Sequence, residues 1–237
     1  MKLTAIFRIA MPSKLRELLF SLRDESYAAF SSRLVPKTNL IGVRVPLLHN
    51  LAKKIAKADY ENYLHQPSFY LEEKLLKGLL VGYLKIDFSK TLDYLYAFLP
   101  EIDSWEVCDL TASNLKIFKK NLYEGQAFII DCLKQNEEFT IRFALVLLLS
   151  YYIEEEYFPW LIEIVSKIKS EEYYVNMALA WLISIMYIKF PGRTLELLDG
   201  RLTDFVHNKA ISKITDSYRV SKEEKNFLRT IRIKQRR

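Results

Sequence analysis

The sequence contains few cysteines, glycines and prolines, and each shortage narrows the class of protein. Its 237 residues include 2 cysteines, 6 glycines and 7 prolines. Cys108 and Cys132 are too few for a disulfide framework, and their spacing matches no metal-ligand motif. We therefore expect two free thiols, no metal site, and a reducing compartment such as the cytoplasm.

The sequence also has no apolar run long enough for a membrane-spanning helix. The two longest uncharged runs, Phe143 to Ile153 and Tyr173 to Ile188, fall short of the roughly 20 apolar residues that cross a bilayer. The opening stretch, Met1 to Met11, shows no small-residue cleavage site after its short apolar run. We expect a protein that is neither exported nor inserted in a membrane.

Apolar residues recur at intervals of three and four along nearly the whole chain, which is the spacing of one helix face. With scarce glycine and proline and 50% hydrophobic residues, this periodicity predicts an all-α protein. The predicted helices span residues 12–30, 46–58, 69–85, 88–99, 103–120, 122–135, 137–152, 155–169, 171–190, 194–201, 203–217 and 222–233.

The connections between these helices are short, which is typical of antiparallel helix pairs that each bury a face against the next pair. We predict one domain, residues 1–237, built as a solenoid-like stack of such pairs, an α-α superhelix. A cluster resembling four-helix bundles is the structural alternative. The predicted domain ends in a basic helix and tail at about residues 219–237.

The stretch from Asp103 to Asp109 is the strongest candidate for chemistry. Asp103 is a good N-cap, and Glu106 three residues later can complete a capping-box-like pair. Trp105 and Asp109 are four apart, so they lie on nearly one face of the predicted helix. An indole beside a carboxylate can hold a cation. The alternative is that Trp105 packs in the core and Asp109 serves as a cap or an ion-pair partner.

Two further residues are candidates. Arg142 lies near the start of a predicted helix, where its charge opposes the helix dipole, so a carboxylate or phosphate partner is implied. Trp181 lies mid-helix with Ala178 and Ala180 nearby, which lets another surface approach closely. Each also has a structural interpretation, a salt bridge for Arg142 and a core anchor for Trp181.

The basic charge is concentrated at the end of the chain. Lys and Arg number 35 against 29 Asp and Glu, a formal net charge of +6. The terminal basic residues are Arg219, Lys222, Lys225, Arg229, Arg232, Lys234, Arg236 and Arg237. A basic terminal helix and tail suits a phosphate backbone, although such tails can also be merely solvated.

The order of five motifs resembles the AlkD-like DNA alkylation repair enzymes, within a superfamily of HEAT-like-repeat DNA glycosylases. The resemblance covers roughly Leu15 to Arg232. The motifs are Ile41-Gly-Val-Arg-Val-Pro46, Ser104-Trp-Glu-Val-Cys-Asp109, Thr140-Ile-Arg-Phe-Ala144, Tyr173-Tyr-Val-Asn-Met-Ala-Leu-Ala-Trp181, and His207-Asn-Lys-Ala-Ile211 with Ser217-Tyr-Arg219.

The resemblance implies a HEAT-like-repeat fold and a specific activity. Members of this family excise cationic N3- or N7-alkylated purines from double-stranded DNA, without needing to flip the base. Two tryptophans, an aspartate and an arginine line their concave cleft, and these match Trp105, Trp181, Asp109 and Arg142. The resemblance further implies that the protein needs no cofactor and is a monomer. It also implies a cytoplasmic protein that associates with a bacterial-type nucleoid. The expected DNA contacts are Arg44, Lys53, Lys209 and Arg219.

The chain departs from the family pattern around the second tryptophan, where polar or basic residues are replaced by Met177, Ser184 and Ile185. Its region before Gly42 also looks shortened. Two alternatives to the glycosylase therefore stay open, a non-catalytic nucleic-acid-binding protein and a helical-repeat scaffold for protein interactions. The scaffold predicts an apolar or acidic groove. The binding protein predicts DNA affinity that survives loss of Asp109.

Overall fold

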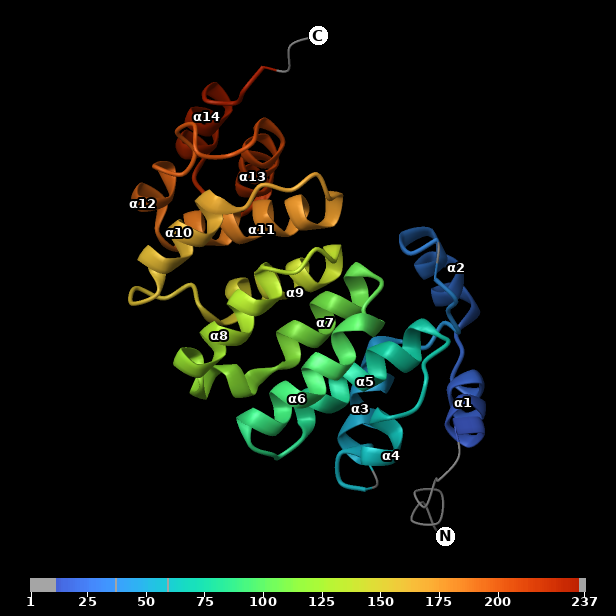
Figure 1. Ribbon diagram of the computed structural model, residues 1–237. Helices are drawn as coiled ribbons and strands as arrows, with labels where there is room; N and C mark the ends of the chain where they lie inside the picture. Colours follow the sequence, from blue (N-terminus) through green and yellow to red (C-terminus); the bar gives the residue numbers. More distant parts are fainter. Residues whose placement is uncertain (1–11, 37, 59, 235–237) are drawn as a thin grey trace. The chain divides into compact units, whose positions relative to one another are not determined.

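The computed structural model describes residues 12–36, 38–58 and 60–234, and within these ranges every regular element is a helix (Figure 1). The all-α prediction is confirmed. The chain divides into two compact units, Met1–Asn121 (unit 1) and Leu122–Arg237 (unit 2), each with its own buried core. The prediction that both belong to one domain stays a prediction.

Unit 1 contains two layers of helices. Its elements are α1 (Pro12–Ser21), α2 (Glu25–Leu34), α3 (Val45–Ile55), α4 (Tyr60–Leu64), α5 (Leu71–Tyr83), α6 (Phe88–Phe98), the 3-10 helix η2 (Leu99–Glu101), α7 (Trp105–Asn114) and the 3-10 helix η3 (Lys116–Lys120). Helices α3, α5 and α7 pack in succession as one layer, and α4 and α6 pack against α5. The sequence pattern did not predict α4.

Unit 2 repeats this arrangement. Its helices are α8 (Leu122–Leu133), α9 (Glu138–Tyr151), α10 (Phe158–Lys167), α11 (Tyr173–Lys189), α12 (Pro191–Leu195), α13 (Asp204–Asp216) and α14 (Lys222–Thr230). Helices α9, α11 and α13 pack in succession, and α8, α12 and α14 pack against them in turn. The predicted stack of helix pairs is thus confirmed within each unit. Arg236 and Arg237 of the predicted tail lie outside the described residues.

The predicted start of α7 is wrong by one residue. The N-cap is Ser104, whose hydroxyl accepts a hydrogen bond from the backbone N–H of Val107 at 3.4 Å. Asp103 instead forms an ion pair with Lys74 of α5, with an N–O distance of 2.5 Å. Both residues are suitable caps, and the ion pair to α5 decides between them. The helix also ends early, at Asn114, and η3 begins two residues later, at Lys116.

The predicted helix at residues 12–30 is two helices, α1 and α2. Asp24 ends the first and caps the second, because its carboxylate accepts a hydrogen bond from the N–H of Tyr27 at 3.0 Å. The backbone N–H of Asp24 also donates to the carbonyl of Gly42 at 2.9 Å. This contact with a residue far along the chain fixes the break.

Glycine in α5 allows α7 to approach unusually closely. A Cβ atom on Gly78 would lie 1.8 Å from Oγ1 of Thr111, and one on Gly82 would lie 2.4 Å from Nδ2 of Asn114. Neither distance is possible between real atoms, so both positions require glycine if the packing is kept. Thr111 and Asn114 are buried on the side of α7 that faces α5. The opposite side, which carries Trp105 and Asp109, is thereby turned outward.

A buried carboxylate organises the turn before α3. Glu72 of α5, 2% exposed, accepts hydrogen bonds from the backbone N–H groups of Ile41 at 2.8 Å, Gly42 at 2.6 Å and Val43 at 3.1 Å. Gly42 has a φ of +102°, in the region that favours glycine, as the sequence predicted. Arg44, an expected DNA contact, follows this turn directly.

The described residues contain neither a membrane-spanning helix nor a group of metal ligands. None of the helices there has the length and apolar character needed to cross a membrane. No group of three or more His, Cys, Asp or Glu side chains in that part of the chain is placed to hold a metal ion. Cys108 and Cys132 are both free and buried.

Candidate nucleic-acid interface

Trp105 and Asp109 lie together on the outward side of α7. Both are partly exposed, in contrast to the buried Val107 on the opposite side of the helix. Their four-residue spacing places them about 6 Å apart along the helix axis and within about 40° of one another around it. Trp105 is thus not fully buried, and the choice between a ligand-binding and a structural role for the pair stays a prediction.

Glu106 lies beside this pair on α7 and has an unusual environment. Burial raises the pKa of its carboxyl above the ordinary value, and the nearby charge of Glu72 raises it further. The predicted capping role of Glu106 is wrong, since the cap bond at this end comes from Ser104. Sequence reasoning could not find the raised pKa, because the burial of Glu106 and its closeness to Glu72 both depend on the tertiary fold.

Replacing Glu106 by glutamine is expected to raise the melting temperature at neutral pH. A carboxyl whose folded pKa is raised destabilises the folded state above that pKa, and this penalty disappears as the pH falls through it. The neutral amide carries no such penalty. The difference in melting temperature between Glu106→Gln and the parent protein should therefore shrink as the pH approaches the unfolded value of about 4.3. Thermal unfolding across a pH series, followed by circular dichroism, measures it. Equal melting temperatures at neutral pH would contradict the assignment.

In unit 2, two residues of α9, Arg142 and Glu138, form hydrogen bonds with the first turn of α11. The guanidinium Nη1 of Arg142 donates to the backbone carbonyl of Tyr174 at 2.8 Å, and Glu138 accepts from the backbone N–H of Tyr174 at 2.6 Å. The Arg142 guanidinium also lies 5.9 Å from the centre of the Tyr174 ring. Arg142 is only 6% exposed. The partner that its charge implied thus includes a backbone carbonyl, and the contact positions α11.

Trp181 lies on the same side of α11 as Tyr174. Seven residues are two helical turns, so Trp181 follows Tyr174 by about 10 Å along that side. Met177, Trp181 and Ile185 are each partly exposed there, which makes an apolar stripe. Of the three residues that depart from the family pattern, Met177 and Ile185 therefore lie on the accessible surface, whereas Ser184 is buried.

An aromatic row connects the first turns of α9, α11 and α13. The ring of Phe139 lies 5.3 Å from that of Tyr174, which lies 5.3 Å from that of Tyr173. The ring of Tyr173 lies 6.2 Å from that of Phe205 on α13. Nζ of Lys209 lies 5.8 Å from the centre of the Phe205 ring. Arg142 and Lys209 were both predicted as site residues from the sequence. The aromatic row that connects them was not predicted.

The other expected DNA contacts lie at exposed positions. Arg44 pairs with Asp24 at an Nε–O distance of 2.8 Å, and its guanidinium lies 5.4 Å from the centre of the Tyr27 ring. Exposed ion pairs contribute about 0 to 1 kcal/mol, so a phosphate can replace Asp24 at little cost. Lys53, on the last turn of α3, and Arg219, in the loop after α13, are also exposed.

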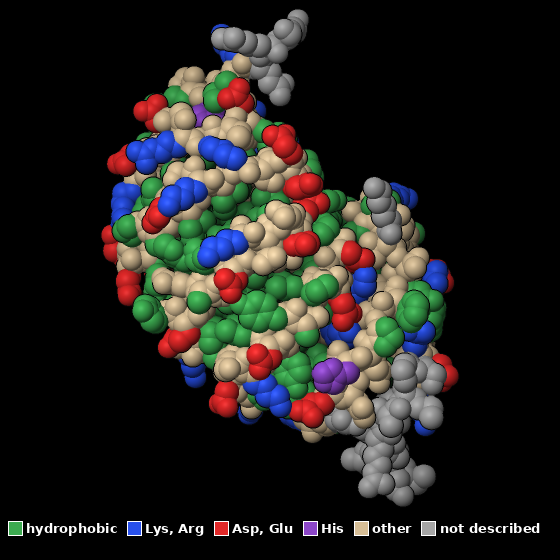
Figure 2. All heavy atoms as spheres, in the orientation of Figure 1, with side chains coloured by type: hydrophobic (Ala, Val, Ile, Leu, Met, Phe, Trp, Pro, Cys, Tyr) green, Lys and Arg blue, Asp and Glu red, His purple; other side chains and the backbone are tan. Residues whose placement is uncertain are grey.

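Charge on the face drawn in Figure 2 is mixed. Over the helices of unit 2 visible there, lysine and arginine side chains are interspersed with acidic ones, and apolar side chains lie between the rows. No single-sign basic strip covers this view of the described residues. A DNA contact in unit 2 is therefore better sought at the first turns of α11 and α13 than across the whole face.

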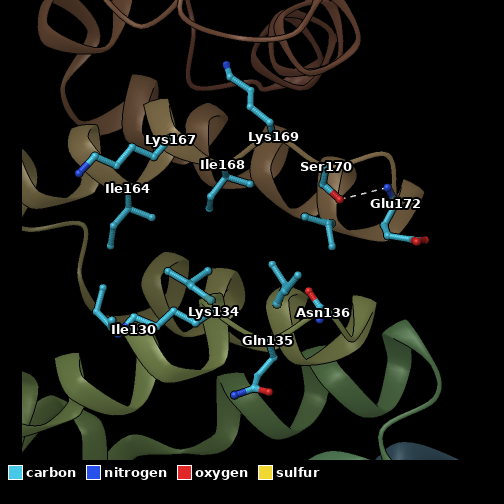
Figure 3. Close-up of a pocket in the computed structure, with 13 residues that line it drawn as sticks. Ile130, Lys134, Gln135, Asn136, Ile164, Lys167, Ile168, Lys169, Ser170 and Glu172 are labelled. Atoms are coloured by element: carbon cyan, nitrogen blue, oxygen red, sulfur yellow. Dashed lines mark hydrogen bonds between the residues drawn. The ribbon is translucent and has the colours of Figure 1, made fainter.

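Figure 3 shows a second feature of unit 2, the α8–α11 hollow, of about 600 Å³. Its apolar lining consists of Ile130, Leu133, Ile141, Ile164, Ile168 and Val175. Three lysines, Lys134, Lys167 and Lys169, lie at its edge, and two of them have partners: Nζ of Lys167 lies 2.6 Å from Oε1 of Glu163, and Nζ of Lys169 donates to the carbonyl of Arg201 at 2.7 Å. Lys169 points away from the hollow (Figure 3).

The fold and the exposed side chains define a class, a protein of stacked helix pairs that presents aromatic, acidic and basic groups on its accessible surface. The profile of the DNA alkylation repair enzyme family matches residues 15–215, which is most of the chain. The protein belongs to this family of DNA alkylation repair enzymes. No curated protein sequence gives a significant match.

Proposed function

We propose that the protein is a DNA glycosylase that hydrolyses the N-glycosidic bond of cationic N3- or N7-alkylated purines in double-stranded DNA. The observation that supports this most is the pair formed by Trp105 and Asp109, partly exposed on a helix whose other side is fixed against α5. The ligand carries a positive charge on its alkylated base, and further positive charge develops on its sugar during the reaction. An aromatic face and a carboxylate suit such a ligand.

The chemistry that Asp109 is proposed to assist is breakage of the bond between C1′ and the purine nitrogen. The bonding electrons leave with the alkylated base, which departs as a neutral molecule, and positive charge develops on the sugar. Water then bonds to C1′ and loses a proton, which leaves an abasic site. An ionised Asp109 stabilises the developing sugar cation and orients the water.

The two tryptophans are proposed to select the alkylated nucleoside. A cation over an indole face gains about 0.5 to 2 kcal/mol, depending on how far it is removed from water. Trp105 and Trp181 both keep part of their surface accessible for such a contact. Arg142 is buried and bonded to the Tyr174 carbonyl, so its proposed part is to position α11 rather than to hold a phosphate.

The apolar stripe of α11 favours a second candidate, a scaffold that binds another protein. Met177, Trp181 and Ile185 lie in succession on one side of the helix, each partly exposed. Such a stripe suits a protein partner as well as the faces of bases. The scaffold would bind neither alkylated nor normal DNA with the salt dependence of phosphate contacts, and this separates the two candidates.

Release of free base tests the proposal. Duplex DNA treated with a methylating agent is incubated with the purified protein, and 7-methylguanine and 3-methyladenine are measured in the supernatant by chromatography. We expect release well above the spontaneous loss in a sample without protein. Untreated duplex DNA is the control and should yield no free purine. Binding without release would favour the non-catalytic alternative.

A further inference from the structure

A small hollow lies at the end of unit 2, between α13 and the segment that follows α14. It is lined by Phe205, Asn208, Lys209, Ser212, Arg232 and Ile233 and has a volume of about 450 Å³. We call it the C-terminal hollow. Two of its side chains are cationic, and it begins at Phe205, where the aromatic row of unit 2 ends. It therefore continues the aromatic row that starts at Phe139.

The hollow is built by hydrogen bonds that hold the end of the chain against α13. The side-chain amide of Asn208 donates to the carbonyl of Ile233 at 2.9 Å and accepts from the N–H of Ile233 at 3.0 Å. His207, 3% exposed, lies with Nε2 2.8 Å from the carbonyl of Ile231. The backbone is thus fixed on both sides of Arg232. The side chain of Arg232 is therefore attached to the backbone at a defined position on the rim of the hollow.

The charge of the hollow is poorly compensated. Between residues 204 and 234 the chain has eight lysines and arginines against four aspartates and glutamates. On α13 itself the acidic residues, Asp204 and Asp216, occupy the two ends of the helix, whereas Lys209 lies between them. Among the described residues no ion pair engages Lys209 or Arg232. Two cations that share a preformed hollow favour an anionic ligand.

We propose that the C-terminal hollow binds a phosphodiester group of the DNA backbone through Lys209 and Arg232. The proposal rests on the proposed function in one respect, that DNA is the partner. A backbone phosphate is preferred to a free anion because the aromatic row leads directly to the hollow, and exposed rings beside basic groups suit a nucleic-acid strand. Asn208 is the positioning residue, because it fixes Arg232 without contributing charge.

The first test separates a built site from simple charge attraction. Binding of undamaged duplex DNA is measured by fluorescence anisotropy over a series of salt concentrations, and the logarithm of the affinity is plotted against the logarithm of the salt concentration. Removing one phosphate contact reduces the slope by about 1. The variant Lys209→Gln with Arg232→Gln removes the one proposed contact and should reduce the slope by about 1. The matched control, Lys222→Gln with Arg229→Gln on α14, removes the same charges and should change the slope by less than half as much.

The second test uses a substitution that leaves the net charge unchanged. Asn208→Ala frees Ile233 from α13, so Arg232 loses its defined position, and the slope should fall in the same direction as for the charge variant but by less than 1. Asn226→Ala, which removes an exposed amide on α14, should leave it unchanged. If Asn208→Ala unfolds the protein, the charge variant and its control still decide the matter. Equal slopes for the charge variant and the control would overturn the proposal.

Inorganic phosphate, added at constant ionic strength, distinguishes the source of the anion. The parent protein and the Lys209 and Arg232 variant are compared by their affinity for DNA. If low millimolar phosphate abolishes the difference between these affinities, the hollow is a free-anion site and the proposal is wrong. These outcomes are separate from those of the proposed function. Base release with unchanged slopes would leave the glycosylase standing without this site, and absence of any DNA binding at low salt would remove both.

Discussion

Asp109→Asn is expected to lower the single-turnover rate of base release by a factor of about 10² to 10³, which corresponds to about 3 to 4 kcal/mol. Asparagine keeps the shape of the side chain and most of its hydrogen bonding but removes the negative charge. The loss should therefore fall on the step in which the sugar becomes cationic. Binding of the same DNA should stay equal or tighten, because a carboxylate near phosphates repels them.

The control for this experiment removes an equivalent charge from the other layer of unit 1. Asp93, on α6, is exposed, and Asp93→Asn should leave both the rate and the affinity unchanged. Rates are measured with enzyme in excess over DNA, so that product release does not enter. If Asp109→Asn releases base as fast as the parent protein, Asp109 has no part in the chemical step.

Glu72→Gln is expected to lower the free energy of unfolding by about 3 kcal/mol. The carboxylate of Glu72 accepts three backbone N–H groups from residues 41–43 and is 2% exposed. An amide offers one oxygen, and its NH₂ group would face an N–H donor. Hydrogen bonds to a charged group contribute about 1.5 to 3 kcal/mol, and a buried donor left unpaired costs about 1 to 3 kcal/mol. The midpoint of urea unfolding measures the loss.

Hydrogen exchange shows whether that loss arises at the predicted place. The amides of Ile41, Gly42 and Val43 should exchange faster in Glu72→Gln than in the parent protein, because their acceptor is gone. Glu17→Gln, an exposed substitution on α1, is the control and should change neither the midpoint nor the exchange. Unchanged protection of the three amides would show that Glu72 does not hold this turn.

The helices of unit 2 were largely predictable from the sequence, since their apolar spacing decides them locally. The predicted helices at residues 137–152 and 171–190 correspond to α9, Glu138–Tyr151, and α11, Tyr173–Lys189. The turn at Gly42 before Pro46 was equally predictable, because few residues other than glycine adopt its positive φ. In each of these cases the residue types alone carry the information.

The errors arose where distant residues decide between two local choices. The apolar spacing of residues 12–30 continues across Asp24, and the break there depends on the contact with Gly42. Asp103 and Ser104 are both suitable caps, and the ion pair with Lys74 selects Ser104. Sequence reasoning has no access to either contact.

The candidate site was predicted one residue at a time, and its assembly was not. The pairing of Trp105 with Asp109 followed from helical spacing, and the structure places both on the outward side of α7. That Arg142 meets a carboxylate or phosphate stays a prediction, and its hydrogen bond to the Tyr174 carbonyl was not foreseen. The role of Asn208 depends on a hydrogen bond to a residue 25 positions later, which no spacing rule reveals. The expectation that all four predicted site residues line a common cleft stays a prediction.

The most direct test of the central claim uses a duplex oligonucleotide with one 7-methylguanine at a known position. After incubation with the purified protein, mild alkali cleaves the strand wherever an abasic site has formed. We expect one protein-dependent product, cut at the modified guanine, and none from the unmodified duplex. We also expect this product nearly to disappear with Asp109→Asn under single-turnover conditions. Tight binding of the modified duplex without any cleavage would contradict the assignment of the protein as a glycosylase.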